Sequence, residues 1–331
     1  PVSRVYFFPR EPILLTAGKD NKIKMWIFDA ADGSARLLKS REGHTAPPRH
    51  IRYYGDVTEA SMGTGANAEG CQILSAGSDK AFRVFHTARD AQSRELSQGP
   101  LLKKAKQLHV APEDLKLAPI LGFAATETRA RDWCNVITCH EGDVNAYVWK
   151  FDQRALGKVV LRQPEWAGSG SNVMSTPEVP ERQALCVGIT ACGNYGVVGT
   201  RGGVVYIYNM QSGEARGAFP KVKGNKSTPH ESMLLARGQA RPGSVWAAHK
   251  SVIGNGTATT ITTKSAAAAA AATAAAAEAR AIHQGHQGPV TGVQVDALNS
   301  TLVSSGLDGT LRFWDFKTHA LLEVVRVGVG I

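Results

Sequence analysis

The sequence lacks the patterns that mark a membrane-spanning or secreted chain. None of its apolar runs reaches the roughly 18 residues that a spanning helix needs, and no charged segment followed by an apolar core comes after Pro1. Its five cysteines are an odd number and form no CxxC pair, which favours buried thiols in a reducing compartment over disulfides or a zinc site. We therefore expect a soluble, globular chain.

Motifs that carry enzyme chemistry are also missing. The sequence contains no G-x-S-x-G elbow, Walker loop or HExxH helix, and the run Arg201-Gly202-Gly203 is too short to cradle a phosphate. Cys139 and His140 are adjacent, as metal ligands can be, but single Cys and His residues on apolar strands are usually packing groups. We predict no enzymatic activity, no cofactor and no metal site.

Charge is the first positive signal. The chain has 38 Lys and Arg residues against 28 Asp and Glu residues, so its formal net charge is +10 and its pI is near 9.5. Such a balance favours polyanionic surroundings such as nucleic acid or a nucleoprotein. The alternative is that the charge only maintains solubility.

The stretch Leu302 to Asp315, LVSSGLDGTLRFWD, follows a Gly-His pair that ends at His286. Asp308 begins an Asp-Gly turn, where its carboxylate can accept hydrogen bonds from backbone N–H groups and from the ring of His286. Six residues later Trp314 needs an acceptor for its indole N–H, which Ser304 can supply. We predict one buried hydrogen-bonded chain, typical of a WD-repeat unit. A hydrolase triad is the alternative use of the same Ser, His and Asp.

Two other segments keep three of the four positions. They are Thr16, Asp20 and Trp26 in the first, and His44, Ser75 and Asp79 in the second. In the second segment Phe85 stands where tryptophan is expected, so the indole donor is lost while aromatic packing remains.

Two further segments are more degenerate. Val136 to Lys150 keeps Asp143 and Trp149, places Cys139 at the hydroxyl position, and has no evident upstream histidine. Ile189 to Ser212 keeps only the strand pattern, with a tyrosine and a glycine at the Trp and Asp positions.

The tryptophan-equivalent positions are 26, 85, 149, 208 and 314, so they are spaced 59, 64, 59 and 106 residues apart. A bare repeat needs roughly 40 to 45 residues, so every interval contains an inserted loop. We predict an all-β chain, a WD-repeat β-propeller region with about five recognisable blades. They lie near residues 5–38, 43–87, 120–162, 184–219 and 283–325. Since both ends interrupt a unit, we expect part of a larger, tandem propeller protein; a closed five-bladed ring is the alternative.

Two insertions have unusual composition. The run from Lys103, KKAKQLHV, favours a helix whose lysines either face solvent or contact phosphate or an acidic partner. Residues 257–281 are rich in threonine and then almost all alanine. Alanine has the highest helix propensity, but without an apolar stripe the segment has little to dock, so we predict a low-complexity insert without chemistry.

The segments between the blades are the most specific part of the sequence. The strongest are Ser40 to Gly55, SREGHTAPPRHIRYYG, and Arg89 to Gln98, RDAQSRELSQ. Further matching segments are KKAKQLHVAPEDLKLAP, RDW before VITCHEG, ITACGN, YNMQSG and GPVTGVQVDALN. With these segments, most of the chain outside the alanine-rich insert resembles the U3 small-nucleolar-RNA-associated protein family numbered twenty-one, a tandem WD-repeat subunit of the small-subunit processome.

This resemblance implies a non-enzymatic scaffold in the nucleus and nucleolus that supports pre-rRNA processing and small ribosomal subunit biogenesis. It implies partners in the UTP-B subcomplex, other WD-repeat proteins including the periodic tryptophan protein, and association with pre-rRNA and the U3 snoRNP. It implies no membrane and no small-molecule substrate. Family members carry two seven-bladed propellers and a helical C-terminal region, so this chain would represent some blades of the second propeller.

The fold also serves other interaction modules, so a ubiquitin-ligase substrate receptor or a chromatin adaptor is the alternative function. In either case basic residues on the inserted loops are the candidate RNA or partner contacts. They are Arg41, Arg49, Arg52, Lys103, Lys104, Lys106, Lys221, Lys223 and Lys226.

Overall fold

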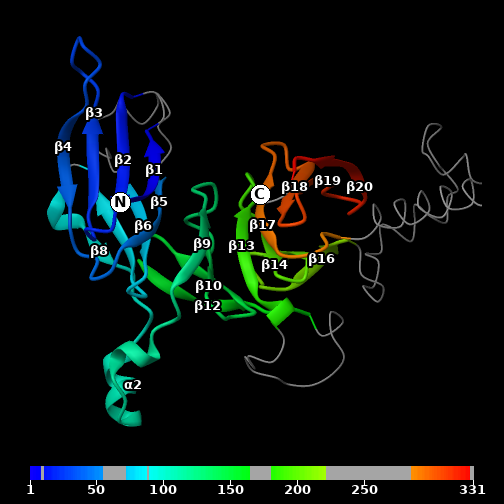
Figure 1. Ribbon diagram of the computed structural model, residues 1–331. Coiled ribbons are helices and arrows are strands. Elements are labelled where there is room, and N and C mark those ends of the chain that lie inside the picture. The colour runs from blue at the N-terminus through cyan, green and yellow to red at the C-terminus, as the bar shows by residue number, and fades with distance from the viewer. Residues whose placement is uncertain (9–10, 55–71, 88, 165–179, 221–284, 329–331) are drawn as a thin grey trace, which may run out of the picture. The chain divides into compact units, whose positions relative to one another are not determined.

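The computed structural model describes residues 1–8, 11–54, 72–87, 89–164, 180–220 and 285–328. Within these ranges the chain forms five four-stranded antiparallel sheets, here called sheets A to E in chain order (Figure 1). All five belong to one compact unit, residues 1–221 with 285–331. The predicted all-β architecture of WD-repeat propeller blades is therefore confirmed. The low-complexity insert at 257–281 lies outside the described residues.

Each sheet is a meander, in which strands that follow one another in the chain are hydrogen-bonded neighbours. Sheet A contains β1 (Val2–Phe7), β2 (Ile13–Gly18), β3 (Ile23–Ile27) and β4 (Arg36–Arg41). Sheet B contains β5 (Pro48–Tyr54), β6 (Gln72–Gly77), β7 (Phe82–His86) and β8 (Arg94–Glu95). Sheet C contains β9 (Ile120–Ala125), β10 (Val136–His140), β11 (Ala146–Lys150) and β12 (Ala155–Leu161). Sheet D contains β13 (Ala184–Ile189), β14 (Tyr195–Thr200), β15 (Val205–Asn209) and β16 (Ala215–Phe219). Sheet E contains β17 (Val290–Val295), β18 (Thr301–Gly306), β19 (Thr310–Asp315) and β20 (Leu321–Arg326).

Sheet B extends further along the chain than the predicted blade at 43–87. Its outer strand β8 pairs with β7, and Arg83 lies opposite Glu95 with their charged groups 3.5 Å apart. The rest of the insertion forms the helix α2 (Leu101–Leu108) and the 3-10 helix η2 (Pro112–Leu115). Two other 3-10 helices, η1 (Asp90–Gln92) and η4 (Pro180–Arg182), precede β8 and β13. None of the described helices has the length and apolar character needed to cross a bilayer.

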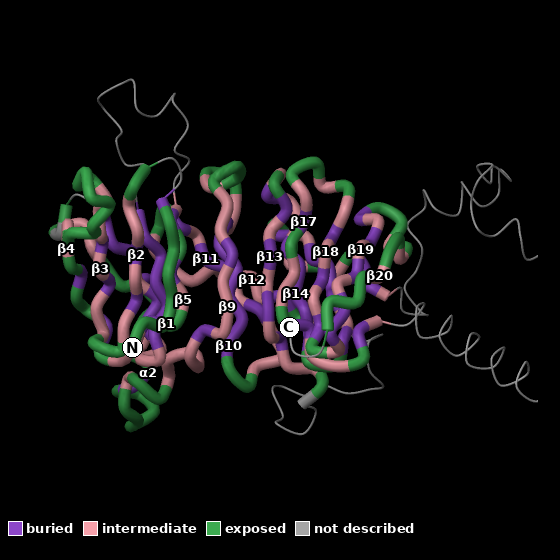
Figure 2. Tube along the Cα trace, turned by 45° about the horizontal axis from the view of Figure 1, so that its top comes forward, coloured by how far each residue is buried: buried purple, intermediate pink, exposed green. Residues whose placement is uncertain are grey.

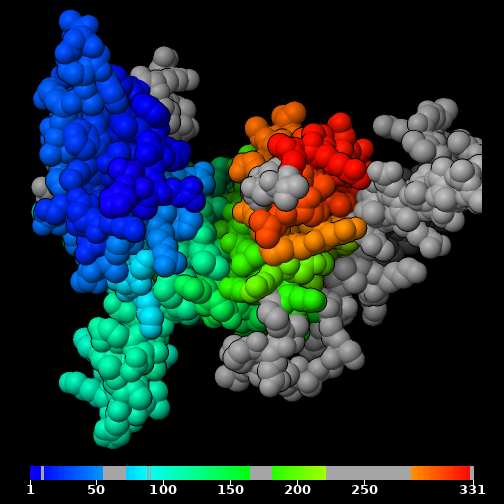
Figure 3. Space-filling model, in the orientation of Figure 1, coloured from blue at the N-terminus to red at the C-terminus, as the bar shows by residue number. Residues whose placement is uncertain are grey.

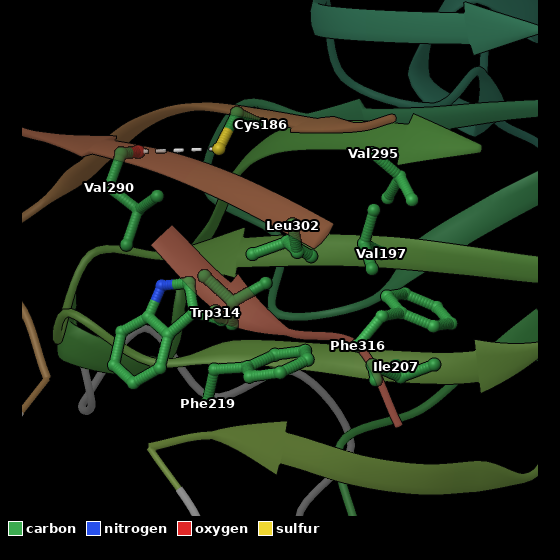
Figure 4. Close-up of a cluster of buried hydrophobic side chains, with 10 residues drawn as sticks. Cys186, Val197, Ile207, Phe219, Val290, Val295, Leu302, Trp314 and Phe316 are labelled. Carbon is green, nitrogen blue, oxygen red and sulfur yellow. Dashed lines mark hydrogen bonds between the residues drawn. The ribbon is translucent and has the colours of Figure 1, made fainter. Parts of the chain in front are cut away.

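Consecutive sheets pack against one another through apolar side chains, and the first strands make much of this contact. β5 lies against β1 and β2, β9 against β5, β13 against β9 and β10, and β17 against β13 and β14. Figure 4 shows the cluster between sheets D and E, where Val197 and Phe219 of sheet D meet Leu302 and Trp314 of sheet E. Similar clusters join sheet A to sheet B and sheet B to sheet C. Buried residues consequently lie along the inner strands, while exposed residues gather on the loops, on α2 and on the strand β1 (Figure 2).

Gly203 lies in the turn between β14 and β15, where sheet D meets the chain that leads into sheet E. Its φ is 83°, in the left-handed region that disfavours side chains. A Cβ at this position would also collide with the carbonyl oxygen of His286. Only glycine therefore allows the two sheets to approach this closely.

We expect Gly203→Ala to lower the free energy of unfolding by roughly 2 kcal/mol or more, since left-handed strain of about 1 to 2 kcal/mol adds to the collision. Gly33→Ala is the matched control, because Gly33 has a φ of 73° and nothing within 4 Å of an added Cβ. It should lose only the strain. Chemical denaturation measures both; equal losses would contradict close packing at Gly203.

Candidate functional site

The four residues predicted to form a buried chain in sheet E lie within hydrogen-bond distance of one another. The indole Nε1–H of Trp314 donates to Ser304 Oγ over 2.9 Å, and Ser304 Oγ lies 2.8 Å from His286 Nε2. His286 Nδ1 lies 3.1 Å from the Asp308 carboxylate. Because the carboxylate only accepts, Nδ1 carries the proton and Nε2 accepts from the serine hydroxyl. Hydrogen bonds thus run in one direction, from indole to hydroxyl to imidazole to carboxylate.

Asp308 also accepts hydrogen bonds from the residue after His286 and from its own turn. The backbone N–H of Gln287 donates to it over 3.0 Å and the hydroxyl of Thr310 over 2.8 Å. Burial alone would raise the pKa of Asp308, but these two hydrogen bonds and the one from His286 outweigh it and lower the pKa to about 2. Burial lowers the pKa of His286, so its ring is held neutral. The constellation is a structural clasp, and it leaves the serine hydroxyl buried between two protein partners.

Sheet B repeats this arrangement without the indole. His44 Nε2 lies 2.8 Å from Ser75 Oγ, and His44 Nδ1 lies 3.0 Å from Asp79. The backbone N–H of Thr45 donates to the same carboxylate over 2.9 Å. Against the effect of burial, the hydrogen bond from His44 helps to lower the pKa of Asp79 to about 2. Phe85 stands at the tryptophan position, with its ring centre 6.0 Å from that of His44.

Sheet A keeps the indole end of the chain. Trp26 Nε1–H donates to Thr16 Oγ1 over 2.8 Å. Asp20 pairs with the ammonium group of Lys24, 2.7 Å away, and this hydrogen bond lowers the pKa of the carboxyl group. The carboxylate is therefore held by a lysine of β3.

Sheet C differs from the sequence-based expectation. The hydroxyl that accepts from Trp149 Nε1–H belongs to Thr138, at 2.9 Å, and the predicted residue Cys139 points elsewhere, with its Sγ 3.5 Å from the carbonyl oxygen of Gly122. The imidazole comes from His140 on the same strand, whose Nε2 lies 2.9 Å from Thr138 Oγ1.

Strand register explains this correction. Trp149 lies opposite Val136, and Trp314 lies opposite Leu302; in each case the hydroxyl is two residues further along the strand. The turn of sheet C is one residue longer than that of sheet E, because Cys139 pairs with residue 146 whereas Ser305 pairs with residue 311. Counting backward from the tryptophan through this turn therefore misses the hydroxyl by one residue.

His140 takes the register position that glycine holds in sheets B and E. A Cβ on Gly77 would collide with the ring of His44, and a Cβ on Gly306 with the ring of His286. In sheet C the strand itself supplies an imidazole at this position, and its Nδ1–H donates to the carbonyl oxygen of Ala118 over 2.6 Å. No upstream histidine is needed there.

Asp143, predicted as the carboxylate of sheet C, has other partners. It accepts from the Tyr147 hydroxyl over 2.7 Å and from the backbone N–H of Asn145 over 2.9 Å. In sheet D, Tyr208 fills the tryptophan position and is buried, and burial raises the pKa of its hydroxyl. Val198, two residues beyond the partner of Tyr208, stands where the other sheets have a hydroxyl.

The predicted basic contacts separate into three groups. Arg41 is buried, and its guanidinium donates to the carbonyl oxygens of His86 at 2.9 Å and Thr87 at 2.6 Å. It ties β4 to the end of β7, so its prediction as a surface contact is wrong. The exposed group contains Arg49 and Arg52 on β5 and Lys103, Lys104 and Lys106 on α2. The third group, Lys221, Lys223 and Lys226, lies outside the described residues.

Among the described residues no group of three or more His, Cys, Asp or Glu side chains is placed to hold a metal ion. Burial raises the pKa of the Cys139 thiol and lowers that of His140. Both side chains have protein hydrogen-bond partners.

Thr138→Val should lower the free energy of unfolding by roughly 1 to 3 kcal/mol, because Trp149 loses the buried acceptor for its indole N–H. Cys139→Ser is the matched change at the position that residue spacing alone selects, and we expect it to cost less than 1 kcal/mol. Urea denaturation of both variants checks this. A larger loss in the serine variant would contradict the register described above.

Lowering the pH should reduce the stability that the clasp of sheet E contributes. The folded-state pKa of Asp308 is below its ordinary value, so its charge contributes stability above about pH 4, and this contribution is lost as the pH falls toward about 2. In Asp308→Asn the titrating carboxylate is absent. We expect the stability difference between wild type and variant, measured by denaturation at several pH values, to shrink over this window. A constant difference would contradict the prediction.

Comparison with known proteins gives consistent matches over nearly the whole chain. The family model described as the WDR36/Utp21 second beta-propeller domain matches residues 65–266, and the WD domain, G-beta repeat model matches residues 1–26 and 278–315. The U3 small nucleolar RNA-associated protein 21 homolog of Schizosaccharomyces pombe is 33% identical over 328 residues, which are 99% of this chain and 27% of that protein.

Two further relatives cover the same extent. The human WD repeat-containing protein 36 is 30% identical over 98% of this chain and 27% of its own length. The U3 small nucleolar RNA-associated protein 21 of Saccharomyces cerevisiae is 26% identical over 100% of this chain and 26% of its own length. The chain thus spans about a quarter of the length of these relatives. On the strength of the family model and the relatives together, the chain belongs to the WDR36/Utp21 family of WD-repeat proteins, in the region of its second β-propeller domain.

Proposed function

We propose that the protein containing this chain is a non-enzymatic scaffold for making the small ribosomal subunit, working in the nucleolus as part of the small-subunit processome. The observation that supports this most directly is that the side chains able to act as a nucleophile or a base are hydrogen-bonded to each other inside the blades. In sheets B, C and E the histidine and the hydroxyl are buried and bonded to each other. They hold the strands of each blade together, so binding falls to exposed loops and strand edges.

The names of the relatives supply the biological setting. Two of them are described as associated with U3 small nucleolar RNA. Within that setting we propose the UTP-B subcomplex, with its other WD-repeat proteins including the periodic tryptophan protein, as the place of assembly. Pre-rRNA and the U3 snoRNP are the proposed RNA-containing partners. A net charge of +10 agrees with polyanionic surroundings.

The first strands of sheets A and B supply a candidate RNA contact. Arg49 and Arg52 are exposed on β5, and Arg4 Nε donates to the carbonyl oxygen of Arg49 over 3.3 Å, which brings a third guanidinium to the same place. Burial, together with Arg4 and Arg49, lowers the pKa of the neighbouring His50 to about 4. Glu141 lies 3.8 Å from Arg49 and offsets part of this charge. The cluster is positive overall and suited to a phosphate backbone.

We expect Arg49→Glu/Arg52→Glu in the full-length protein to weaken binding to pre-rRNA and to make that binding less dependent on salt, because each phosphate contact adds about 0.9 to the salt slope of log K. Lys19→Glu/Lys317→Glu, with the same change of charge at exposed turns, is the control. Binding is measured by filter retention at several salt concentrations. Unaltered salt dependence in the arginine variant would contradict direct RNA contact at β5 and leave the scaffold proposal intact.

The scaffold role itself is tested by depleting the parent protein and measuring small-subunit rRNA precursors. We expect unprocessed precursors to accumulate, and the tagged protein to co-purify with processome proteins. Unchanged precursors, with recovery of ubiquitin-ligase or chromatin components in place of processome proteins, would contradict the proposal.

A further inference from the structure

The helix α2 (Leu101–Leu108) between sheets B and C exposes large apolar side chains. Figure 1 and Figure 3 show the helix projecting from the sheets. Ala105 is its buried residue, while Leu102 is 70% exposed and Leu108 is 61% exposed. Val110, just beyond the helix, is 42% exposed. Three apolar residues so exposed within nine positions exceed the single, scattered apolar residues that a surface normally carries, and we call them the apolar patch of α2.

This segment is held in place despite its exposure. An isolated eight-residue helix is unstable in water, so its order depends on the sheets. The amide of Gln98 ties the start of the insertion to its end and to sheet B. Its Nε2 donates to the carbonyl oxygen of Lys80, between β6 and β7, over 3.2 Å, and its Oε1 accepts from the backbone N–H of Leu117 over 2.8 Å. Lys116 pairs with Glu95 of β8, 3.2 Å away. The fold thus presents the exposed leucines on a fixed support.

Lysine side chains border the apolar face of the helix. At 100° per residue, Leu101, Ala105 and Leu108 share one face and Leu102 borders it. The exposed residues Lys103, Lys104 and Lys106 cover the rest of the helix, which has no acidic residue. The first acidic residues after the helix in the chain, Glu113 and Asp114, belong to η2. An apolar stripe with a lysine border is complementary to an apolar surface bordered by carboxylates.

We propose that α2 docks an amphipathic, acidic segment of a protein partner, which covers Leu102 and Leu108 with apolar side chains and pairs its carboxylates with the three lysines. A nucleic acid would satisfy the lysines but offers little apolar surface to the two leucines between them, so protein fits the patch better. This inference deepens the scaffold function proposed above and depends on it for the identity of the assembly.

The small patch indicates a modest contact that gains strength from other contacts in the same assembly. Electrostatic attraction would guide the segment to the helix and fix its orientation, and burial of the leucines would slow its release. Binding should therefore depend on both the leucines and the lysines.

The partner segment is found by zero-length crosslinking. The tagged full-length protein is purified in its native assembly and treated with a carbodiimide, which joins lysine amines to carboxylates in direct contact. We expect Lys103, Lys104 or Lys106 to be linked to Asp or Glu residues in one amphipathic segment of another protein. Crosslinks only to acidic residues of this same protein would overturn the proposal. So would linkage of the three lysines to RNA on ultraviolet irradiation with no protein crosslink.

A synthetic peptide of the crosslinked segment then tests the contact. Fluorescence anisotropy with the full-length protein should show at least tenfold weaker binding for Leu102→Asp/Leu108→Asp, and weaker binding with a smaller salt dependence for Lys103→Glu/Lys104→Glu. Leu298→Asp is the matched control, because Leu298 is 85% exposed in a turn of sheet E. It should bind as wild type does. Gln98→Ala should weaken binding without altering the contact residues, because it loosens the support of α2.

Equal binding by the α2 leucine variant and the Leu298 control would overturn the proposal. Circular dichroism of every variant establishes that the sheets remain folded. If the peptide does not bind α2 but rRNA processing depends on the protein as expected, the docking proposal is wrong and the scaffold function remains supported. If the wild-type protein does not co-purify with processome proteins, the scaffold function is contradicted. The peptide-binding measurement then tests the docking proposal by itself.

Discussion

In four of the five described sheets, a hydroxyl on the second strand holds the strands of the blade in register. In sheets A, C and E it accepts the indole N–H of a tryptophan on the third strand, and in sheets B, C and E it also meets an imidazole nitrogen. Each of these groups would be costly to bury alone, and together they satisfy one another in a medium of low dielectric. A slip of one residue would turn the hydroxyl to the other face and leave the donor unpaired.

Two of these tryptophans also join their sheet to the one before it. Trp314 of sheet E packs with Phe219 of sheet D, with ring centres 5.6 Å apart, and Trp149 of sheet C packs with Phe82 of sheet B at 5.4 Å. The indole therefore has two roles, because its N–H fixes the strand register and its ring fills the space between sheets. Polar specificity and apolar packing come from one side chain.

A core held in this way leaves the surface free to specialise. The exposed arginines of β5 and the exposed leucines and lysines of α2 lie on different parts of the scaffold and differ in chemistry: one suits phosphate, and the other suits an acidic, apolar protein segment. A blade protein that carries both kinds of surface is suited to hold RNA and protein components together. This is the property that the proposed scaffold function requires.

The sequence by itself determined the fold class, the family and the polar chain of sheet E. Ser304, Asp308 and Trp314 stand at offsets set within one hairpin, and the Gly-His pair ahead of the first strand supplies His286. The sequence did not determine Thr138 and His140, although strand alternation contains a signal for both. That signal becomes visible only when the longer turn of sheet C is known, and turn length decides which residues face each other. Tertiary structure also decided which basic residues are exposed: Arg41 is buried between sheets A and B, whereas Lys103 is exposed on α2. Net charge cannot distinguish them, since burial depends on how separate sheets pack.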